Sequence, residues 1–163
     1  MKEVFKNILL FIGAALVILL ILEFAFRIFM PQVTYSEAKR NFPKIWQPSD
    51  YLPATLKPNA EDTHIGPYGD FNVTIKVNSY GLRDYERPVN MALNRVLVVG
   101  DSLTFGQGVE MNETFSKQLE NMLNKNGIRY RVFNAGNTGG ESPAPYYLYL
   151  KNYAVEKFKP NVI

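Results

Sequence analysis

The longest run of apolar residues lies at the N-terminus of the chain. Ile8 to Leu22 includes no charged or strongly polar side chain, and only Glu23 and Arg27 interrupt the apolar pattern after it. A spanning helix needs about 20 such residues, and Glu23 and Arg27 lie one helical turn apart, where they can pair. The pattern predicts that residues 1–30 form a retained transmembrane anchor. A cleaved signal peptide or a buried core helix is the alternative, but no A-x-A-like cleavage site follows Leu22.

The charges around this run bear on its orientation. Lys2 and Lys6 precede it, which favours a cytoplasmic N-terminus. The bias is weak because basic residues also follow: Arg27, Lys39, Arg40 and Lys44. Together with the absence of cysteine and the motifs below, it leads us to expect a single-pass protein of the cell membrane, with its domain on the extracytoplasmic side.

The next segment, residues 31–93, is rich in proline. Six of the ten prolines fall between positions 31 and 67, and proline fixes φ and biases the preceding residue toward extended geometry. Val73, Ile75 and Val77 then alternate with polar residues, as in a half-buried strand. We expect a proline-rich connector with one short strand, in which His64 is an ordinary residue.

From residue 94 the pattern changes to alternating strands and helices. A short continuous apolar run is typical of a strand buried on both faces, and apolar residues at helical spacing indicate amphipathic helices. The expected elements are a strand at Arg95–Val99, a helix from Phe115 to Leu123, a strand at Tyr130–Phe133, a helix from Ser142 to Phe158 with Tyr147, Leu150, Ala154 and Phe158 on one face, and the opening of a strand at Val162. This order implies an α/β fold with a parallel sheet, right-handed crossovers and helices on both faces.

Two glycine-rich loops, Gly100–Gly108 and Asn134–Ser142, follow the first two of these strands. Ligands of parallel sheets lie beyond the carboxyl ends of the strands. Ser102 comes just after the first strand, so its hydroxyl can serve as a nucleophile, with backbone N–H groups of both loops as oxyanion donors. The first loop lacks the lysine of a phosphate-binding loop and the glycine pattern G-x-G-x-x-G, and Thr104 replaces the second glycine of G-x-S-x-G. Glycine-rich turns of this kind also occur without catalysis.

Composition excludes several other classes of function. The chain has no cysteine, which rules out a disulfide scaffold, a thiolate metal site and a cysteine nucleophile. A net charge of +3 with 20% charged residues is too mild a basic excess to indicate a nucleic-acid partner. An apolar content of 47% excludes a disordered chain.

Three segments resemble the SGNH (GDSL) hydrolase family. Val98–Gly106, with the sequence VVGDSLTFG, resembles the first block of that family. The loop Asn134–Ser142 resembles its second block. Asn78–Asp84, with the sequence NSYGLRD, resembles a segment found just upstream of the domain in membrane-anchored members.

The resemblance implies a three-layer α/β/α sandwich and ester hydrolysis. It makes Ser102 the nucleophile and a backbone N–H donor to the oxyanion. It makes Gly139 the second donor, with Gly140 as the near alternative. Gly100 and Asp101 become supporting loop residues, and no metal or organic cofactor is implied. The expected partners are a small-molecule or glycan acyl ester and the membrane that holds the N-terminal helix.

The sequence departs from the family after Val162. The family's G-x-N-D and D-x-x-H blocks, which carry an asparagine and the catalytic aspartate and histidine, have no counterpart, and His64 precedes Ser102 without that spacing. We therefore expect residues 94–163 to be the N-terminal part of a truncated SGNH domain, and the 163-residue chain alone to be inactive as an esterase.

Three functions remain open at this point. The first is a membrane-anchored serine esterase acting outside the cytoplasm. The second is an O-acyltransferase of the same fold that uses Ser102 to pass acyl groups to a cell-surface glycan. The third is a non-catalytic membrane protein in which the partial domain only binds a ligand or is vestigial.

Overall fold

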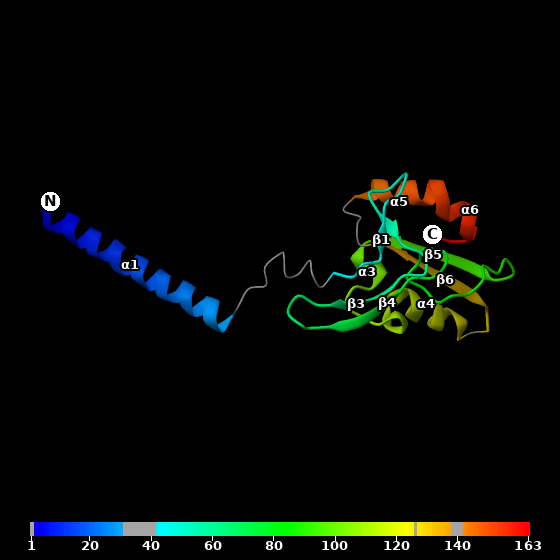
Figure 1. Cartoon of the computed structure of the whole chain (residues 1–163), viewed down its shortest axis with the longest axis horizontal. Coiled ribbons are helices and arrows are strands. Elements are labelled where there is room, and N and C mark those ends of the chain that lie inside the picture. The colour runs from blue at the N-terminus through cyan, green and yellow to red at the C-terminus, as the bar shows by residue number, and fades with distance from the viewer. Residues whose placement is uncertain (1, 31–41, 126, 138–141) are drawn as a thin grey trace. The chain divides into compact units, whose positions relative to one another are not determined.

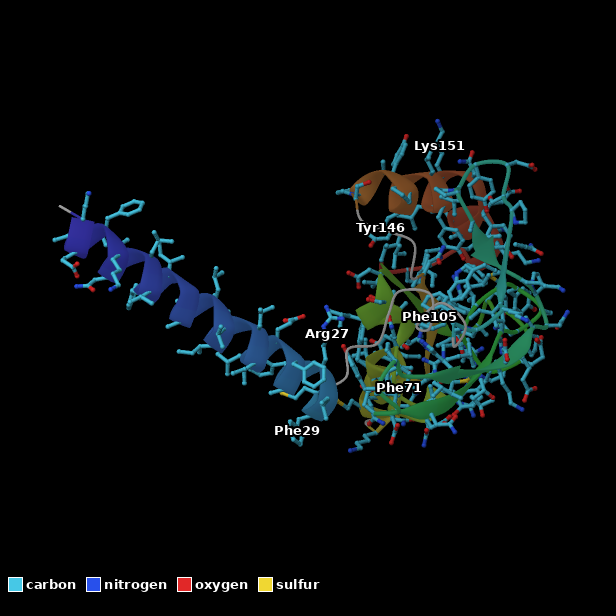
Figure 2. All side chains as sticks on the ribbon, turned by 60° about the vertical axis from the view of Figure 1, so that its left-hand side comes forward. Arg27, Phe29, Phe71, Phe105, Tyr146 and Lys151 are labelled. Carbon is cyan, nitrogen blue, oxygen red and sulfur yellow. The ribbon has the colours of Figure 1, made fainter. Side chains whose placement is uncertain are left out.

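A single helix, α1 (Lys2–Phe29), forms the first of two units of the chain (Figure 1). The structure is a computed structural model and describes residues 2–30, 42–125, 127–137 and 142–163. Contacts divide the chain between residues 38 and 39, and each unit is described by itself. None of the residues of α1 is buried, and its side chains project all round the helix (Figure 2).

The apolar helix α1 has the dimensions of a membrane span. Its 28 residues rise roughly 42 Å, which exceeds the hydrocarbon core of about 30 Å. Within the described ranges it is the one helix long and apolar enough to cross a membrane. As expected from their spacing, Glu23 and Arg27 pair, with 2.8 Å between Oε1 and Nε.

A parallel pair of strands lies at the centre of the second unit. β5 (Asn94–Gly100) and β6 (Tyr130–Gly136) run in register, with Val96 opposite Val132 and Gly100 opposite Gly136. On the other side of β5, Val96 makes a parallel bridge to Val162, and the N–H of Leu97 donates to the carbonyl of Val162 at 2.9 Å. The predicted strands and the opening at Val162 are confirmed, with β5 between β6 and residue 162.

Helices lie on opposite sides of this pair (Figure 1). On one side is α4 (Phe115–Asn124), which follows the short helices α3 (Ser102–Phe105) and η1 (Met111–Glu113). On the other side a continuous helical segment consists of α5 (Pro143–Tyr149), the π-helical turn η2 (Leu150–Ala154) and α6 (Val155–Phe158). Leu97, Phe133, Ala135, Ala154 and Phe158 are buried together between this segment and the strands.

The segment before β5 contains more strands than the single one predicted. β1 (Trp46–Gln47) pairs with β2 (Thr55–Leu56), and β3 (Glu61–Ile65) pairs with β4 (Asn72–Lys76), both antiparallel. Their apolar side chains form a second core, with Phe105 of α3 among its buried members. Residues 39–93 therefore belong to the same compact unit as β5 and β6.

Two details of the helices differ from the sequence pattern. The residues of α4 that are buried are Ser116, Lys117 and Glu120, whereas Phe115 and Met122 are exposed. In the second helical segment Ala154 and Phe158 are buried as expected, but Tyr147 is exposed. The π-helical turn η2 explains this difference, because its wider hydrogen-bonded ring rotates the residues before it relative to those after it.

Candidate functional site

Ser102 occupies the first position of α3, directly beyond the end of β5. It is half-buried, whereas Asp101 is exposed. The carboxylate of Asp101 accepts a hydrogen bond from the N–H of Leu103 at 3.0 Å, so it caps the helix. Asp101 thereby fixes the backbone on which Ser102 is carried.

Two glycines allow the loop after β5 to pack closely on its surroundings. A side chain at Gly100 would overlap the Thr104 hydroxyl of the following helix. A side chain at Gly136, the last residue of β6, would overlap the backbone of Phe105. α3 therefore rests directly on the end of β6, which brings the loop of Ser102 beside the start of the second glycine-rich loop.

A buried arginine holds the other end of the α3 loop. Arg83 has no exposed surface, and its guanidinium donates to the carbonyls of Phe105 (3.0 Å), Gly106 and Val109 (2.6 Å). It also lies over the Phe105 ring, 5.0 Å from the centroid. Burial lowers the pKa of Arg83 to about 10, opposed by the charge of Glu110, so the side chain stays cationic at neutral pH. One side chain thus ties together the backbone on the C-terminal side of Ser102.

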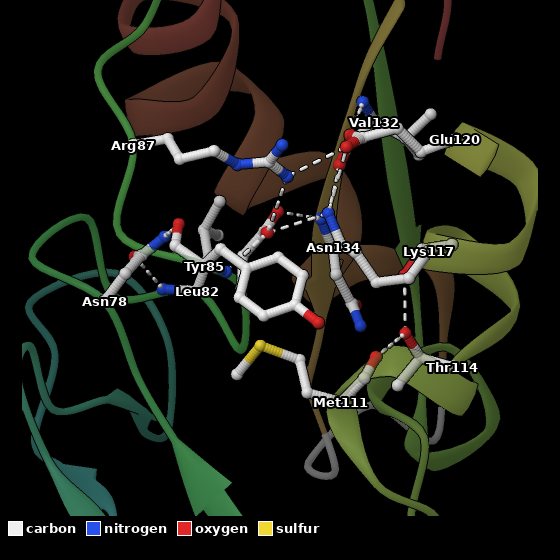
Figure 3. Close-up of polar contacts among 12 residues, drawn as sticks. Asn78, Leu82, Tyr85, Arg87, Met111, Thr114, Lys117, Glu120, Val132 and Asn134 are labelled. Carbon is white, nitrogen blue, oxygen red and sulfur yellow. Dashed lines mark hydrogen bonds and ion pairs between the residues drawn. The ribbon is translucent and has the colours of Figure 1, made fainter. Parts of the chain in front are cut away.

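The next residue, Asp84, holds β6 through Lys117 and Asn134, both of which are labelled in Figure 3. Its carboxylate accepts from Lys117 Nζ at 2.7 Å and from the backbone N–H of Asn134 at 3.3 Å. Lys117 also donates to the carbonyl of Val132 at 2.7 Å. Burial raises the pKa of Asp84, and the lysine and the backbone donors oppose that effect. Arg83 and Asp84, adjacent in sequence, therefore fix the loop after β5 and the strand that carries the second loop.

The second loop is described only at its start. Asn137 donates from its backbone N–H to the carbonyl of Gly100 at 2.9 Å, which joins the two strand ends. Gly139 and Gly140, the predicted oxyanion donors, lie outside the described residues. The structure therefore brings together Gly100, Asp101, Ser102 and the strand end before Gly139.

His64 occupies β3, where its ring is buried between the rings of Phe42 and Phe71 at centroid distances of 5.4 and 4.9 Å. Burial lowers its pKa, and the charge of Arg83 adds to this effect. No hydrogen bond joins a histidine to Ser102 in the part of the chain that the structure describes. His64 is thus a core residue of the β3–β4 hairpin.

The described ranges contain no group of three histidine, cysteine, aspartate or glutamate side chains that could hold a metal ion. At the ends of β5 and β6 the described residues offer the Ser102 hydroxyl, the Asp101 carboxylate and backbone N–H groups.

The residues that organise the site were not all foreseen from the sequence. The NSYGLRD segment drew attention to Arg83 and Asp84 only through its resemblance to other proteins, and nothing in the helical pattern singled out Lys117. Comparison of the chain with family models, curated proteins and solved structures finds no match.

Proposed function

We propose that this protein is a membrane-anchored serine esterase of the SGNH type, in which Ser102 is the nucleophile. The observation that carries the proposal is the position of Ser102 just beyond a parallel strand, on a capped turn packed against the end of the neighbouring strand. This is where ligands of parallel sheets are bound. Helices on both sides of the strands are consistent with a three-layer α/β/α sandwich (Figure 1).

The proposed chemistry is acyl transfer through a covalent intermediate. The Ser102 oxygen attacks the ester carbonyl, the serine proton passes to a base, and the C–O bond to the leaving alcohol breaks as that proton is returned. The backbone N–H groups of Ser102 and Gly139 stabilise the negative oxygen of the tetrahedral intermediate. Water then releases the acid. His64, the one histidine of the sequence, is committed to the hairpin core and does not serve as this base.

The proposed anchor bears on which side of the membrane this chemistry occurs. We propose that α1 spans the cell membrane once and that the second unit lies on the extracytoplasmic side. The apolar character of α1 and the lysines in its first turns, Lys2 and Lys6, support this orientation.

Chemical rescue tests the assignment of Ser102. Serine hydrolases that lack one member of the triad retain roughly 10³-fold acceleration over water, and imidazole in solution can stand in for a missing base. We expect the 163-residue chain to react with a fluorophosphonate slowly, faster with added imidazole, and at Ser102 when the adduct is mapped by mass spectrometry. Ser102→Ala should abolish labelling and Ser79→Ala should not. If imidazole did not change the labelling, and Ser102→Ala were labelled as strongly as the unsubstituted chain, Ser102 would be excluded as the nucleophile.

A further inference from the structure

An apolar pocket lies where β5 and β6 end and α5 begins. Its cavity has a volume of about 80 Å³, which is room for a short chain of small groups rather than for a large ligand. Its walls come from four parts of the second unit: the segment around β1 and β2, residues 81–82, the ends of the parallel strands, and α5. They include Trp46, Leu52, Ala54, Val99, Ala135 and Tyr149.

The pocket is fixed to the backbone that precedes Ser102. Asn137 binds the carbonyl of Gly100 through its N–H at 2.9 Å, and its side chain binds two pocket residues. It accepts from Trp46 Nε1 at 3.3 Å and donates to the carbonyl of Ala54 at 3.3 Å. The wall formed by Trp46 and Ala54 is therefore held at the carboxyl end of β5, two residues before the nucleophile.

A second link runs through α5. Tyr146 lines the pocket, and its pKa is raised by burial and by the negative charge of Asp101. Asp101 immediately precedes Ser102. The hydrogen bond from Asn137 to Gly100 thus ties the pocket to the loop of the nucleophile, and the charge of Asp101 acts on Tyr146 in its wall.

The polarity of the walls selects the class of ligand. A sugar ring needs several hydrogen-bonding partners, and the Asn137 amide is already engaged with Trp46 and Ala54. The Tyr149 hydroxyl is buried and has no hydrogen-bond partner among the described residues. Burial raises the pKa of Tyr149, so the hydroxyl stays protonated. Thr55 and Tyr146 add further hydroxyl groups, but the remaining walls are aliphatic and aromatic and suit an alkyl chain better than a glycan.

We propose that this pocket binds the unbranched alkyl chain of the acyl group that Ser102 receives, and that the substrates are esters of acids longer than acetate. The inference rests on the proposed function for the link to Ser102. The presence of an alkyl-chain site can be measured without catalysis.

Trp46 provides the measurement, because it is the one tryptophan of the chain and lies in the pocket wall. The full chain in lipid nanodiscs is titrated with 6-bromohexanoate, whose bromine quenches an indole that it contacts, and with free bromide as the collisional control. We expect saturable quenching by bromohexanoate that unlabelled hexanoate displaces. Shorter acids should compete more weakly, roughly three- to fourfold for each methylene removed.

Two matched substitutions locate the binding. Ala54→Leu fills the pocket and should weaken binding on the order of tenfold. Ala92→Leu makes the same change in an exposed loop and should leave binding unaltered. The proposal would be overturned if quenching by bromohexanoate rose linearly with its concentration and equally in all variants. It would also be overturned if competition by unlabelled acids did not depend on their chain length in the unsubstituted protein. The series of acids of different chain length uses the unsubstituted protein, so it still tests the proposal if Ala54→Leu fails to fold.

Labelling of Ser102 separates this inference from the proposed function. Saturable quenching without imidazole-assisted labelling overturns the esterase and leaves an alkyl-chain site. Labelling without saturable quenching overturns the pocket assignment and leaves the esterase.

Discussion

His64 illustrates how a single residue can take a role that its chemistry does not suggest. The sequence predicts an ordinary connector residue here, because His64 precedes Ser102 without the D-x-x-H spacing. Instead its ring packs edge-on against Phe42 and Phe71, and its Nδ1 has no hydrogen-bond partner within the described ranges. A neutral imidazole suits this position, because protonation would bury a charge beside Arg83.

The buried imidazole predicts a pH dependence of stability. Because the pKa of His64 is lower in the folded chain than its ordinary value of 6.5, the unfolded chain binds the proton more tightly. The free energy of unfolding should therefore fall as the pH decreases below 6.5, by at most about 1.4 kcal/mol per pH unit from this residue. Denaturant titrations between pH 7 and pH 5 measure the slope.

His64→Phe keeps an aromatic ring and removes the titration, so it should flatten that slope. The ring of Tyr68, which lies at the exposed tip between β3 and β4, offers a control. Tyr68→Phe should leave the slope unchanged. An identical slope in His64→Phe would show that other groups cause the acid sensitivity.

At the scale of elements, β6 has one edge that is closed by side chains. Asn124 binds both the N–H and the carbonyl of Tyr130, at 2.7 and 3.1 Å. Glu120 and Lys117 bind the N–H and the carbonyl of Val132, both at 2.7 Å. Together with Asp84 on Asn134, these contacts occupy alternate residues along one side of the strand. A strand edge satisfied in this way does not recruit a further strand.

This edge depends on a buried ion pair, and removing one partner should be costly. Lys117 and Asp84 have side-chain exposures of 3% and 0%. Lys117→Met leaves the Val132 carbonyl without its donor and the buried carboxylate without its close cation, with only backbone N–H groups and the more distant Arg87 beside it. We expect a loss of about 3–5 kcal/mol in the free energy of unfolding. Lys125→Met, at the exposed end of α4, should change it by less than about 0.5 kcal/mol.

The double substitution Lys117→Met with Asp84→Asn distinguishes the ion pair from packing. It removes the uncompensated charge and should recover part of the loss. If it were as unstable as the sum of the two single variants, the charges would not be coupled across this contact.

The elements themselves were largely predictable, whereas their buried faces were not. Periodicity identified β5, α4, β6 and the helix after Ser142, because those patterns depend on local repeats. The side of α4 that is buried differs from the side with apolar spacing, because polar groups on Lys117 and Glu120 satisfy the edge of β6. This requirement is set by tertiary structure. β1 and β2 have two residues each, too few for any periodicity.

At the scale of the whole molecule, the candidate site combines parts that are distant in sequence. Ser102 follows β5, its loop is held by Arg83, and its neighbouring pocket is walled by Trp46 and Tyr149. The loops at the strand ends were predictable from the sequence, because parallel strands place them together. The contribution of the proline-rich segment was not, since contacts between Trp46 and Asn137 span 91 positions of the chain.

The orientation of the chain in the membrane is the last prediction, and the absence of cysteine makes it measurable. A single cysteine introduced by Tyr68→Cys stands at a site that is 67% exposed in the second unit. In intact cells it should react with a membrane-impermeant maleimide, because the lysines in the first turns of α1 favour a cytoplasmic N-terminus. Glu3→Cys, at the start of α1, should react only after the cells are permeabilised. The opposite pattern would place the Ser102 loop in the cytoplasm, and labelling of both sites in intact cells would mean that α1 does not span the membrane.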